Sequence, residues 1–527
     1  MVGARERRWA GGAGDPARRL SEPDHGHARS CDRGREREGG RVSELDIVGP
    51  QLAILLAAGA VLVWDALLPS RRQYLPYIAL AGILGAAIWT STWVIRGDFQ
   101  TAFDGTFAID QYAVFFQYVF AGITAIVVIA SIDWVDRVGR RQSEYFALVL
   151  TASAGLMFLA GARDLITIFL ALELSSIPQY ILAGWGKDQR SSEAGMKYLL
   201  LGAIASALLL YGMALLYGFA GSTLLTDISA AISNSGADNR SLLVVASILL
   251  IAGFGFKMAV VPFQMWVPDV YQGAPTPVAA FLSVGSKAAA FAVVMRLFFE
   301  GLGEQFLSND WAMIFAVIAA VSMTLGNVLA IVQRDIKRML GYSSIAQAGN
   351  FMIGLAAISI LGEHFVQGAS GVLLFVAAYA FTNLGAFIAV IGISQRIGSD
   401  DIADYAGMWR RAPLLALALA ICLISLAGIP PTAGFWAKLY VFNAGIQADL
   451  AWLVIIGVLN SVISAYYYLA VVRQMFLGEA EEEQRLAISP TVGLALGVAT
   501  VGVVVFGIIP TPLVDAAREA AAIFAVS

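Results

Sequence analysis

Hydrophobic residues along the chain gather in blocks of about 20 residues, the length that a helix needs to cross the hydrocarbon core of a bilayer. Fourteen blocks are found, near 51–69, 77–95, 110–132, 144–161, 164–186, 196–219, 241–266, 277–299, 311–333, 338–360, 371–394, 413–445, 452–476 and 490–510. The pattern predicts an all-α polytopic membrane protein with about 14 transmembrane helices.

Basic residues fall unevenly between the two sets of connecting loops. The odd-numbered loops hold Arg71, Arg72, Arg137, Arg140, Arg141, Lys187, Arg190, Lys197, Arg334, Lys337, Arg338, Arg396, Arg410, Arg411, Arg473 and Arg485, although the loop 267–276 has none. The even-numbered loops and the C-terminus hold only Arg96, Arg163, Arg240 and Arg518. Because basic loops stay in the cytoplasm, we expect both termini of this multi-pass protein to be periplasmic, in a bacterial cell inner (plasma) membrane.

The first 41 residues depart from this pattern. They are rich in Arg, Gly and Asp, show no apolar periodicity, and contain no apolar segment of the kind found in a signal peptide. Ten arginines lie here, on the side that the charge rule disfavours. We expect a disordered tail if residues 1–41 are translated, and we favour an over-extended start, with the protein beginning at or near Val42.

Four charged residues remain in the middle of apolar blocks once the loops, the tail and the helix-end Arg296 are set aside. They are Glu173, Lys257, Lys287 and Lys438. A charge at the bilayer centre costs about 2.5–3.5 kcal/mol on insertion scales, so such residues face a protein interior or a water-filled path. A static salt bridge would explain one lysine paired with Glu173. The other lysines have no carboxylate in the middle of the apolar blocks to pair with. A buried amine exchanges protons near neutral pH more readily than an exposed one, which favours a proton relay.

Two of the blocks contain helix-breaking residues next to a lysine. Gly253, Gly255 and Pro262 surround Lys257, and Pro430 and Pro431 precede Lys438. Irregular backbone at membrane depth is tolerated only inside protein or beside water. A single proline kink could be explained by helix packing alone. Two broken helices five segments apart, each with a lysine, instead indicate the internal repeats of a transporter.

Composition argues against a resident redox centre. Only 14% of residues are charged, the two cysteines are Cys31 and Cys422, and the three histidines are His25, His27 and His364. These residues provide neither the ligand spacing of a zinc or iron–sulfur site nor a histidine pair for haem. No nucleotide-binding motif is present either. We therefore expect no cofactor in this chain.

Several motifs resemble the antiporter-like membrane subunits of NADH-quinone oxidoreductase (respiratory complex I), and most closely the subunit N type. They are Asp269–Val278 (DVYQGAPTPV), Ser286–Ala288 (SKA), Ile336–Ala346 (IKRMLGYSSIA) and Gly428–Phe435 (GIPPTAGF). The resemblance runs from about residue 45 to 510. The tyrosine–glycine form of the first motif, the lysine at 438 and the lack of a long lateral helix after 510 are similar to N rather than to the L or M types.

The resemblance implies fourteen helices with two inverted five-helix repeats containing broken helices, near 144–299 and 311–476. In domain terms it implies a tail over 1–41, three transmembrane helices over 42–140, antiporter-like repeats over 141–300 and 301–480, and a last transmembrane helix with its tail over 481–527. It assigns proton transfer to four residues: Glu173 and Lys257 as a coupled pair, Lys287 as a bridge and Lys438 on the exit side.

In this family the redox chemistry lies elsewhere. The resemblance implies that NADH, FMN, iron–sulfur clusters and quinone belong to partner subunits, that the partners are other membrane-arm subunits of the K, J, A, M and L types, and that no nucleic acid is bound. The chain departs from the pattern at Gln264 and Gln347, near which relatives often carry histidine. Glutamine cannot titrate, so water is expected to bridge there.

Three other readings stay open on the residues alone. A subunit of a multisubunit cation/proton antiporter shares the fold, although the motif from Tyr271 to Val278 argues against it. A ferredoxin- and plastoquinone-linked complex is not excluded by Asp164–Phe169. A purely structural membrane scaffold would have no need of central lysines. The quinone, the electron donor and the choice between H⁺ and Na⁺ are not determined by the sequence.

Overall fold

Helices form at all fourteen apolar blocks in the computed structural model, which describes residues 44–97, 99–138, 141–235, 239–303, 305–358, 365–479 and 484–525. The first seven blocks fold as α2 (Gly49–Leu67), α3 (Leu75–Arg96), α4 (Gln111–Val138), α5 (Gln142–Gly161), α6 (Leu165–Ala183), α7 (Gln189–Ala220) and α9 (Arg240–Met258). The eighth is assembled from α11 (Thr276–Phe281), a π-helix η4 (Leu282–Ser286), α12 (Lys287–Arg296) and a second π-helix η5 (Leu297–Gly301).

The remaining blocks fold as α13 (Gln305–Ile331), α14 (Ile336–Ile358), α15 (Phe365–Ile397), α17 (Pro413–Ala427) with α18 (Ala433–Gln447), α19 (Ala451–Leu477) and α20 (Pro490–Ile508). Within the described ranges, 12 spans are long and apolar enough to cross a membrane, and α17 is a shorter apolar helix. The predicted all-α polytopic fold is confirmed, and the expected number of about 14 is close to this count.

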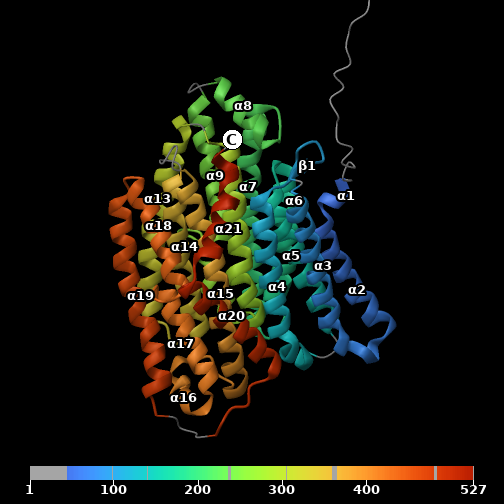
Figure 1. Ribbon diagram of the computed structural model, residues 1–527, viewed down its shortest axis with the longest axis vertical. Coiled ribbons are helices and arrows are strands. Elements are labelled where there is room, and N and C mark those ends of the chain that lie inside the picture. Colours follow the sequence, from blue (N-terminus) through green and yellow to red (C-terminus); the bar gives the residue numbers. More distant parts are fainter. Residues whose placement is uncertain are drawn as a thin grey trace, which may run out of the picture. The chain divides into compact units, whose positions relative to one another are not determined.

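The eighth block lies at the centre of the bundle. The span Thr276–Gly301 is buried on every side and α15 nearly so, whereas α2, α3 and α20 expose broad apolar faces suited to lipid. In Figure 1 the blue helices α2 and α3 lie at one edge and α19 at the other. Lys287, at the start of α12, is thus held in the most protected part of the protein.

Short elements cap the two ends of the bundle. A two-stranded antiparallel hairpin, β1 (Gln100–Ala102) and β2 (Phe107–Ile109), and helix α8 (Leu225–Ser235) lie at the same end as α1 (Glu44–Ile47) and the C-terminus (Figure 1). Helix α16 (Met408–Arg411) lies at the opposite end. The second and sixth connections therefore share one end and the arginine-bearing loop at α16 lies at the other, in agreement with the charge pattern.

The other short elements lie in connections or at the C-terminus. They are the 3₁₀ turns η1 (Pro69–Tyr74), η7 (Ile402–Tyr405) and η8 (Ala522–Ala525), the helix α10 (Trp266–Gly273) and the C-terminal α21 (Thr511–Ala521). The tail predicted after the last transmembrane helix is thus partly helical: α21 is short and contacts α15 and α4. Residues 1–43 lie outside the described residues.

The first interrupted helix breaks around Pro262, as the sequence suggested, but not at the two glycines. Gly253 and Gly255 lie inside α9, and the helix ends when Ala259 adopts a left-handed conformation with φ of 62°. Gly253 serves packing instead, since a Cβ there would lie 2.6 Å from the Leu209 Cβ. The irregular stretch is therefore 259–265, directly after Lys257.

The second interruption separates α17 from α18 and matches the predicted break. Gly428 has φ of 86°, a conformation that favours glycine. Polar groups freed by the break find partners: the Gly434 amide donates to Ser425 Oγ at 3.1 Å, and the Thr432 hydroxyl to the Ile429 carbonyl at 2.7 Å. Satisfying the backbone in this way is the condition for an irregular segment at membrane depth.

Candidate functional site

Lys257 lies in the last turn of α9 and faces α6 and α7. Its side chain is buried, and Nζ donates to Gln179 Oε1 at 3.2 Å and to the Tyr198 hydroxyl at 3.3 Å. The rings of Tyr180 and Tyr198 lie 5.6 and 5.4 Å from Nζ, within cation–π range. The amine is therefore held by neutral oxygens and aromatic faces.

Glu173 is half-buried on α6 and accepts a hydrogen bond from Ser206 Oγ of α7 at 2.6 Å. Within the described residues, no hydrogen bond and no ion pair within 4.0 Å joins it to Lys257. Both residues nevertheless lie against the same two helices. Glu173 of α6 is bonded by Ser206 of α7, and Lys257 bonds Gln179 of α6 and Tyr198 of α7. Gln179, Tyr198 and Ser206, which the sequence analysis did not single out, complete this half of the site.

Lys287 follows the π-helix η4 and points to α14. Nζ donates to Ser344 Oγ at 2.6 Å and to the Ser344 carbonyl, and the Tyr379 ring of α15 lies 5.5 Å away. The side chain is 2% exposed. A π-helix widens a helix by one residue and is frequent at functional sites; here it lies immediately before the lysine, which the sequence did not indicate.

Lys438 lies on α18 beside the second break. Its Nζ donates to the Ala427 carbonyl, the last residue of α17, at 2.9 Å and to Ser461 Oγ of α19 at 3.2 Å. The C-terminal end of a helix carries partial negative charge and unpaired carbonyls, so the break creates a binding position for an amine. Across the described residues, Lys257, Lys287 and Lys438 are all buried, and none forms an ion pair.

Gly428→Ala should displace Lys438. A Cβ at this position would lie 2.8 Å from Lys438 Cδ and 3.4 Å from Nζ, in a backbone conformation that costs an L-residue about 1–2 kcal/mol. We expect lower proton translocation as well as lower thermal stability, measured on the intact complex. Gly97→Ala is the matched control, because Gly97 also has positive φ but a Cβ there would meet nothing within 4 Å. Equal translocation by the two variants would contradict the positioning role of Gly428.

The two glutamines have different surroundings. Gln347, on α14, donates from Nε2 to the Leu426 carbonyl at 2.9 Å and accepts at Oε1 from Asn350 at 3.2 Å. It lines a small cavity together with Lys438. Gln264 lies in the first break, where its Oε1 is buried and has no hydrogen-bond partner among the described residues. A buried unsatisfied oxygen is a natural place for a bound water, which fits the expectation that water bridges there.

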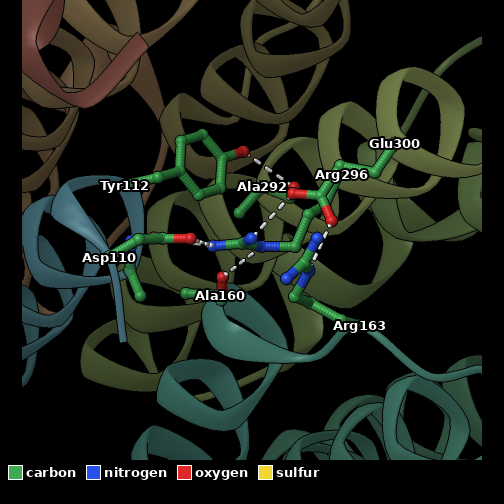
Figure 2. Close-up of polar contacts among 8 residues, drawn as sticks. Asp110, Tyr112, Ala160, Arg163, Ala292, Arg296 and Glu300 are labelled. Carbon is green, nitrogen blue, oxygen red and sulfur yellow. Dashed lines mark hydrogen bonds and ion pairs between the residues drawn. The ribbon is translucent and has the colours of Figure 1, made fainter. Parts of the chain in front are cut away.

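A charged cluster that the sequence analysis missed lies at the other end of the Lys287 helix. Arg296, set aside above as a helix-end residue, is fully buried. Figure 2 shows it between Asp110 and Glu300, with ion pairs of 2.8 Å to each, a hydrogen bond of 2.9 Å to the Ala160 carbonyl, and the Tyr112 ring 5.0 Å away. Arg163 pairs with Glu300 at 2.8 Å. The cluster connects α4, the α5–α6 turn and η5.

The motif that begins at Asp269 forms an ion network at the end of the bundle. Asp269 of α10 bonds Lys197 of α7 at 2.7 Å and Arg338 of α14 at 2.6 Å. Partial burial acts to raise the pKa of Asp269, but the hydrogen bonds from Lys197 and Arg338 outweigh it and hold this pKa below its usual range. The network therefore stabilises the fold above the usual carboxyl pKa, and this contribution is lost as pH falls through the lowered value.

Metal ligation finds no support in the described part of the chain. No group of three or more His, Cys, Asp or Glu residues is placed to hold a metal ion there. Cys422 is a free, buried thiol. Cys31, His25, His27 and His364 lie outside the described residues.

Comparison with known proteins gives consistent matches over most of the chain. Residues 162–464 match the family described as NADH:quinone oxidoreductase/Mrp antiporter, TM. The chain is 45% identical to NADH-quinone oxidoreductase subunit N of Dehalococcoides mccartyi over 483 residues, covering 90% of this chain and 99% of that protein. It is 44% identical to NAD(P)H-quinone oxidoreductase subunit 2 of a Picosynechococcus strain over 441 residues, covering 82% and 81%.

A solved structure is also similar to this chain over most of its length. A chain of respiratory complex I from Thermus thermophilus, solved with bound aureothin, is similar with a TM-score of 0.71 and 31% identity, covering 88% of this chain and 98% of that one.

Proposed function

The chain belongs to the subunit N type of proton-translocating membrane subunits in NADH-quinone oxidoreductase, and from this premise we propose that Glu173, Lys257, Lys287 and Lys438 are the groups that carry its protons. The subunit contributes to the translocase without redox chemistry of its own. It works within the membrane arm, where energy released by quinone reduction in other subunits drives the protons.

The observation that carries this proposal is the neutral environment of three buried amines. Each lysine is held by hydroxyl, amide or carbonyl oxygens, and none by a carboxylate among the described residues. A fixed structural charge at this depth would be expected to have a counter-ion, because an unpaired buried charge costs several kcal/mol. A lysine that is repeatedly protonated and deprotonated has no such need. The environment therefore supports proton carriers over static salt bridges.

The order along the bundle supports a direction of transfer. Glu173 and Lys257 load the first half of the path, Lys287 at the bundle centre bridges the halves, and Lys438 releases the proton beside the break at Gly428. Protonation of one lysine lowers the proton affinity of the next by like-charge repulsion. Repulsion of this kind pushes one proton outward in each cycle.

Glu173→Gln should lower proton translocation several-fold, because it removes the negative charge that favours protonated Lys257. Glu173→Asp keeps the charge and should be milder. The measurement is proton uptake by inverted membrane vesicles, normalised to the content of intact complex. Glu193→Gln, which removes an exposed carboxylate on α7 paired with Lys197, is the matched control. If Glu173→Gln and Lys257→Ala both translocate protons at the control rate, this pair is structural and its place in the proposal is wrong.

We further propose the finer setting of this subunit. It lies in a bacterial inner membrane with both termini periplasmic, which follows from the charge bias of its loops. Its neighbours are the K-, J-, A-, M- and L-type membrane subunits, and NADH, FMN, iron–sulfur clusters and quinone bind to other chains. Labelling of a single cysteine placed after Ala521 by a membrane-impermeant reagent tests the orientation, since only a periplasmic end reacts in intact cells.

A further inference from the structure

Two hydroxyl groups lie between the bridging lysine and the exit lysine. Ser344, on α14, accepts at Oγ from Lys287 Nζ at 2.6 Å and from the Tyr379 hydroxyl at 3.1 Å. Tyr379, on α15, also places its ring 5.5 Å from the Lys287 Nζ. Both hydroxyl-bearing residues are buried. Ser344 and Tyr379 therefore form a continuous hydrogen-bonded line that begins at the lysine and leads toward α15.

Tyr379 also lines a small cavity, and Lys438 lines the same cavity. The cavity is lined by Tyr379, Gln347, Thr382, Ser425 and Lys438, and its volume is about 10 Å³. This is close to the least space that holds one water molecule, about 10–15 Å³. Phe375, Leu426 and Ala437 form apolar parts of the wall, and the polar side chains named above offer the partners that such a water needs. Hydroxyl, water and amine are thus placed in sequence from Lys287 to Lys438.

We propose that Ser344 and Tyr379 form a hydroxyl bridge that passes a proton from Lys287 to a water molecule in this cavity and on to Lys438. The proposal rests on the proposed function of the two lysines and adds two catalytic residues to them. A serine and a tyrosine fit this role because each hydroxyl both donates and accepts a hydrogen bond.

The transfer conserves every proton and needs no redox partner. An N–H bond of protonated Lys287 breaks as a new O–H bond forms on Ser344 Oγ. The original Ser344 proton moves to the Tyr379 oxygen, the original Tyr379 proton moves to the cavity water, and a proton of that water moves to neutral Lys438. Both hydroxyls and the water end neutral, so only the charge has moved from one amine to the other.

The hydroxyl of Tyr379 also gives the bridge a closed and an open arrangement. In the structure, Lys287 and Tyr379 both donate to Ser344 Oγ, so Ser344 has no acceptor in Tyr379 and the line is closed. Rotation of the Tyr379 O–H toward the cavity frees its lone pairs to accept the Ser344 proton. Rotation of the Ser344 O–H toward the Tyr379 oxygen completes the open line, so two hydroxyl rotations connect the two lysines.

Gln347 is not the carrier in this arrangement. Its amide is fixed between the Leu426 carbonyl and Asn350, and an amide cannot take up a proton at neutral pH. Gln347 forms part of the cavity wall, and its hydrogen bond to the Leu426 carbonyl attaches α14 to the last turn of α17. Ser343, adjacent to Ser344, bonds Tyr468 rather than a lysine, so it lies off the line.

The test compares Ser344→Ala, Ser344→Thr and Tyr379→Phe with Tyr145→Phe. Tyr145 is the matched control, because it is also a buried tyrosine bonded to a serine, Ser131 at 2.8 Å, but it touches none of the lysines. The measurement is the rate of proton translocation in vesicles, normalised to the content of intact complex. Lys287→Ala and Lys438→Ala are measured in the same series.

We expect Ser344→Ala and Tyr379→Phe to lower this rate about tenfold, less than the 10²–10⁴-fold effect of losing a general acid or base, since cavity water replaces part of the path. Ser344→Thr should restore most of the rate because threonine returns the hydroxyl. A purely structural role of Ser344 would not predict this recovery. If Ser344→Ala and Tyr379→Phe match Tyr145→Phe while both lysine variants stop translocation, or if Ser344→Thr fails like Ser344→Ala, the bridge is wrong. Normal translocation by the lysine variants would instead refute the proposed function itself.

Discussion

Lys438→Arg is expected to abolish proton translocation as completely as Lys438→Ala. Arginine preserves the positive charge and can still donate to the Ala427 carbonyl, which accepts from Lys438 Nζ at 2.9 Å. It stays protonated in proteins, however, so it cannot release a proton. A positioned proton donor contributes about 10²–10⁴-fold to a transfer step, and its loss should reduce translocation in vesicles to background.

Lys197→Arg provides the comparison for this variant. Lys197 is 41% exposed and ion-paired with Asp269 and Glu193, so exchange of one cation for another should leave translocation near that of the unaltered complex. Full activity of Lys438→Arg would show that Lys438 is a fixed electrostatic element. Loss in Lys438→Ala with retention in Lys438→Arg would lead to the same conclusion.

Arg296→Ala should destabilise the subunit more than any of the lysine substitutions. The guanidinium is fully buried and ion-paired with Asp110 and Glu300, and its Nε donates to the Ala160 carbonyl. Removing one partner of a buried ion pair costs about 3–5 kcal/mol because the remaining charge is left uncompensated. We expect a lower content of assembled subunit in membranes and a lower midpoint of thermal unfolding.

Arg240→Ala is the control for the buried cluster. Arg240 makes a comparable two-bond pair with Asp310, at 2.9 and 3.0 Å, but it is 54% exposed. Exposed ion pairs contribute little because water screens them, so this variant should assemble normally. Equal thermal midpoints for the two arginine variants would mean that burial of Arg296 contributes nothing to stability.

The residues of the proposed relay were identified from the sequence, but their partners were not. A charge inside an apolar block is visible in the sequence, because the block is defined by its own 20 or so residues. Lys257, Lys287 and Lys438 stood out for this reason and are buried. Gln179, Tyr198, Ser344 and Tyr379 come from other helices, and nothing in a single block indicates which helix will face it.

The position of a charged residue along an apolar block does not determine whether that residue is buried, as Arg296 shows. Arg296 was set aside as a helix-end residue, but the residue after β2 and the last turn of α5 bring Asp110 and the Ala160 carbonyl to it. Glu173 gives a similar example: its expected partner was Lys257 and its bonded partner is Ser206. Side-chain pairing depends on how helices are rotated and stacked, which involves residues far apart in the chain.

The sequence by itself determined the membrane class, the helical blocks, the family and the buried lysines. These follow from properties of short segments: length, hydropathy, loop charge and local motifs. Only the tertiary structure decided where α9 breaks, that a π-helix precedes Lys287, and that Lys438 binds the end of α17. The physical reason is that insertion into a bilayer is governed by each segment's own transfer free energy, whereas hydrogen bonds in a bundle are made between segments and exist only after packing.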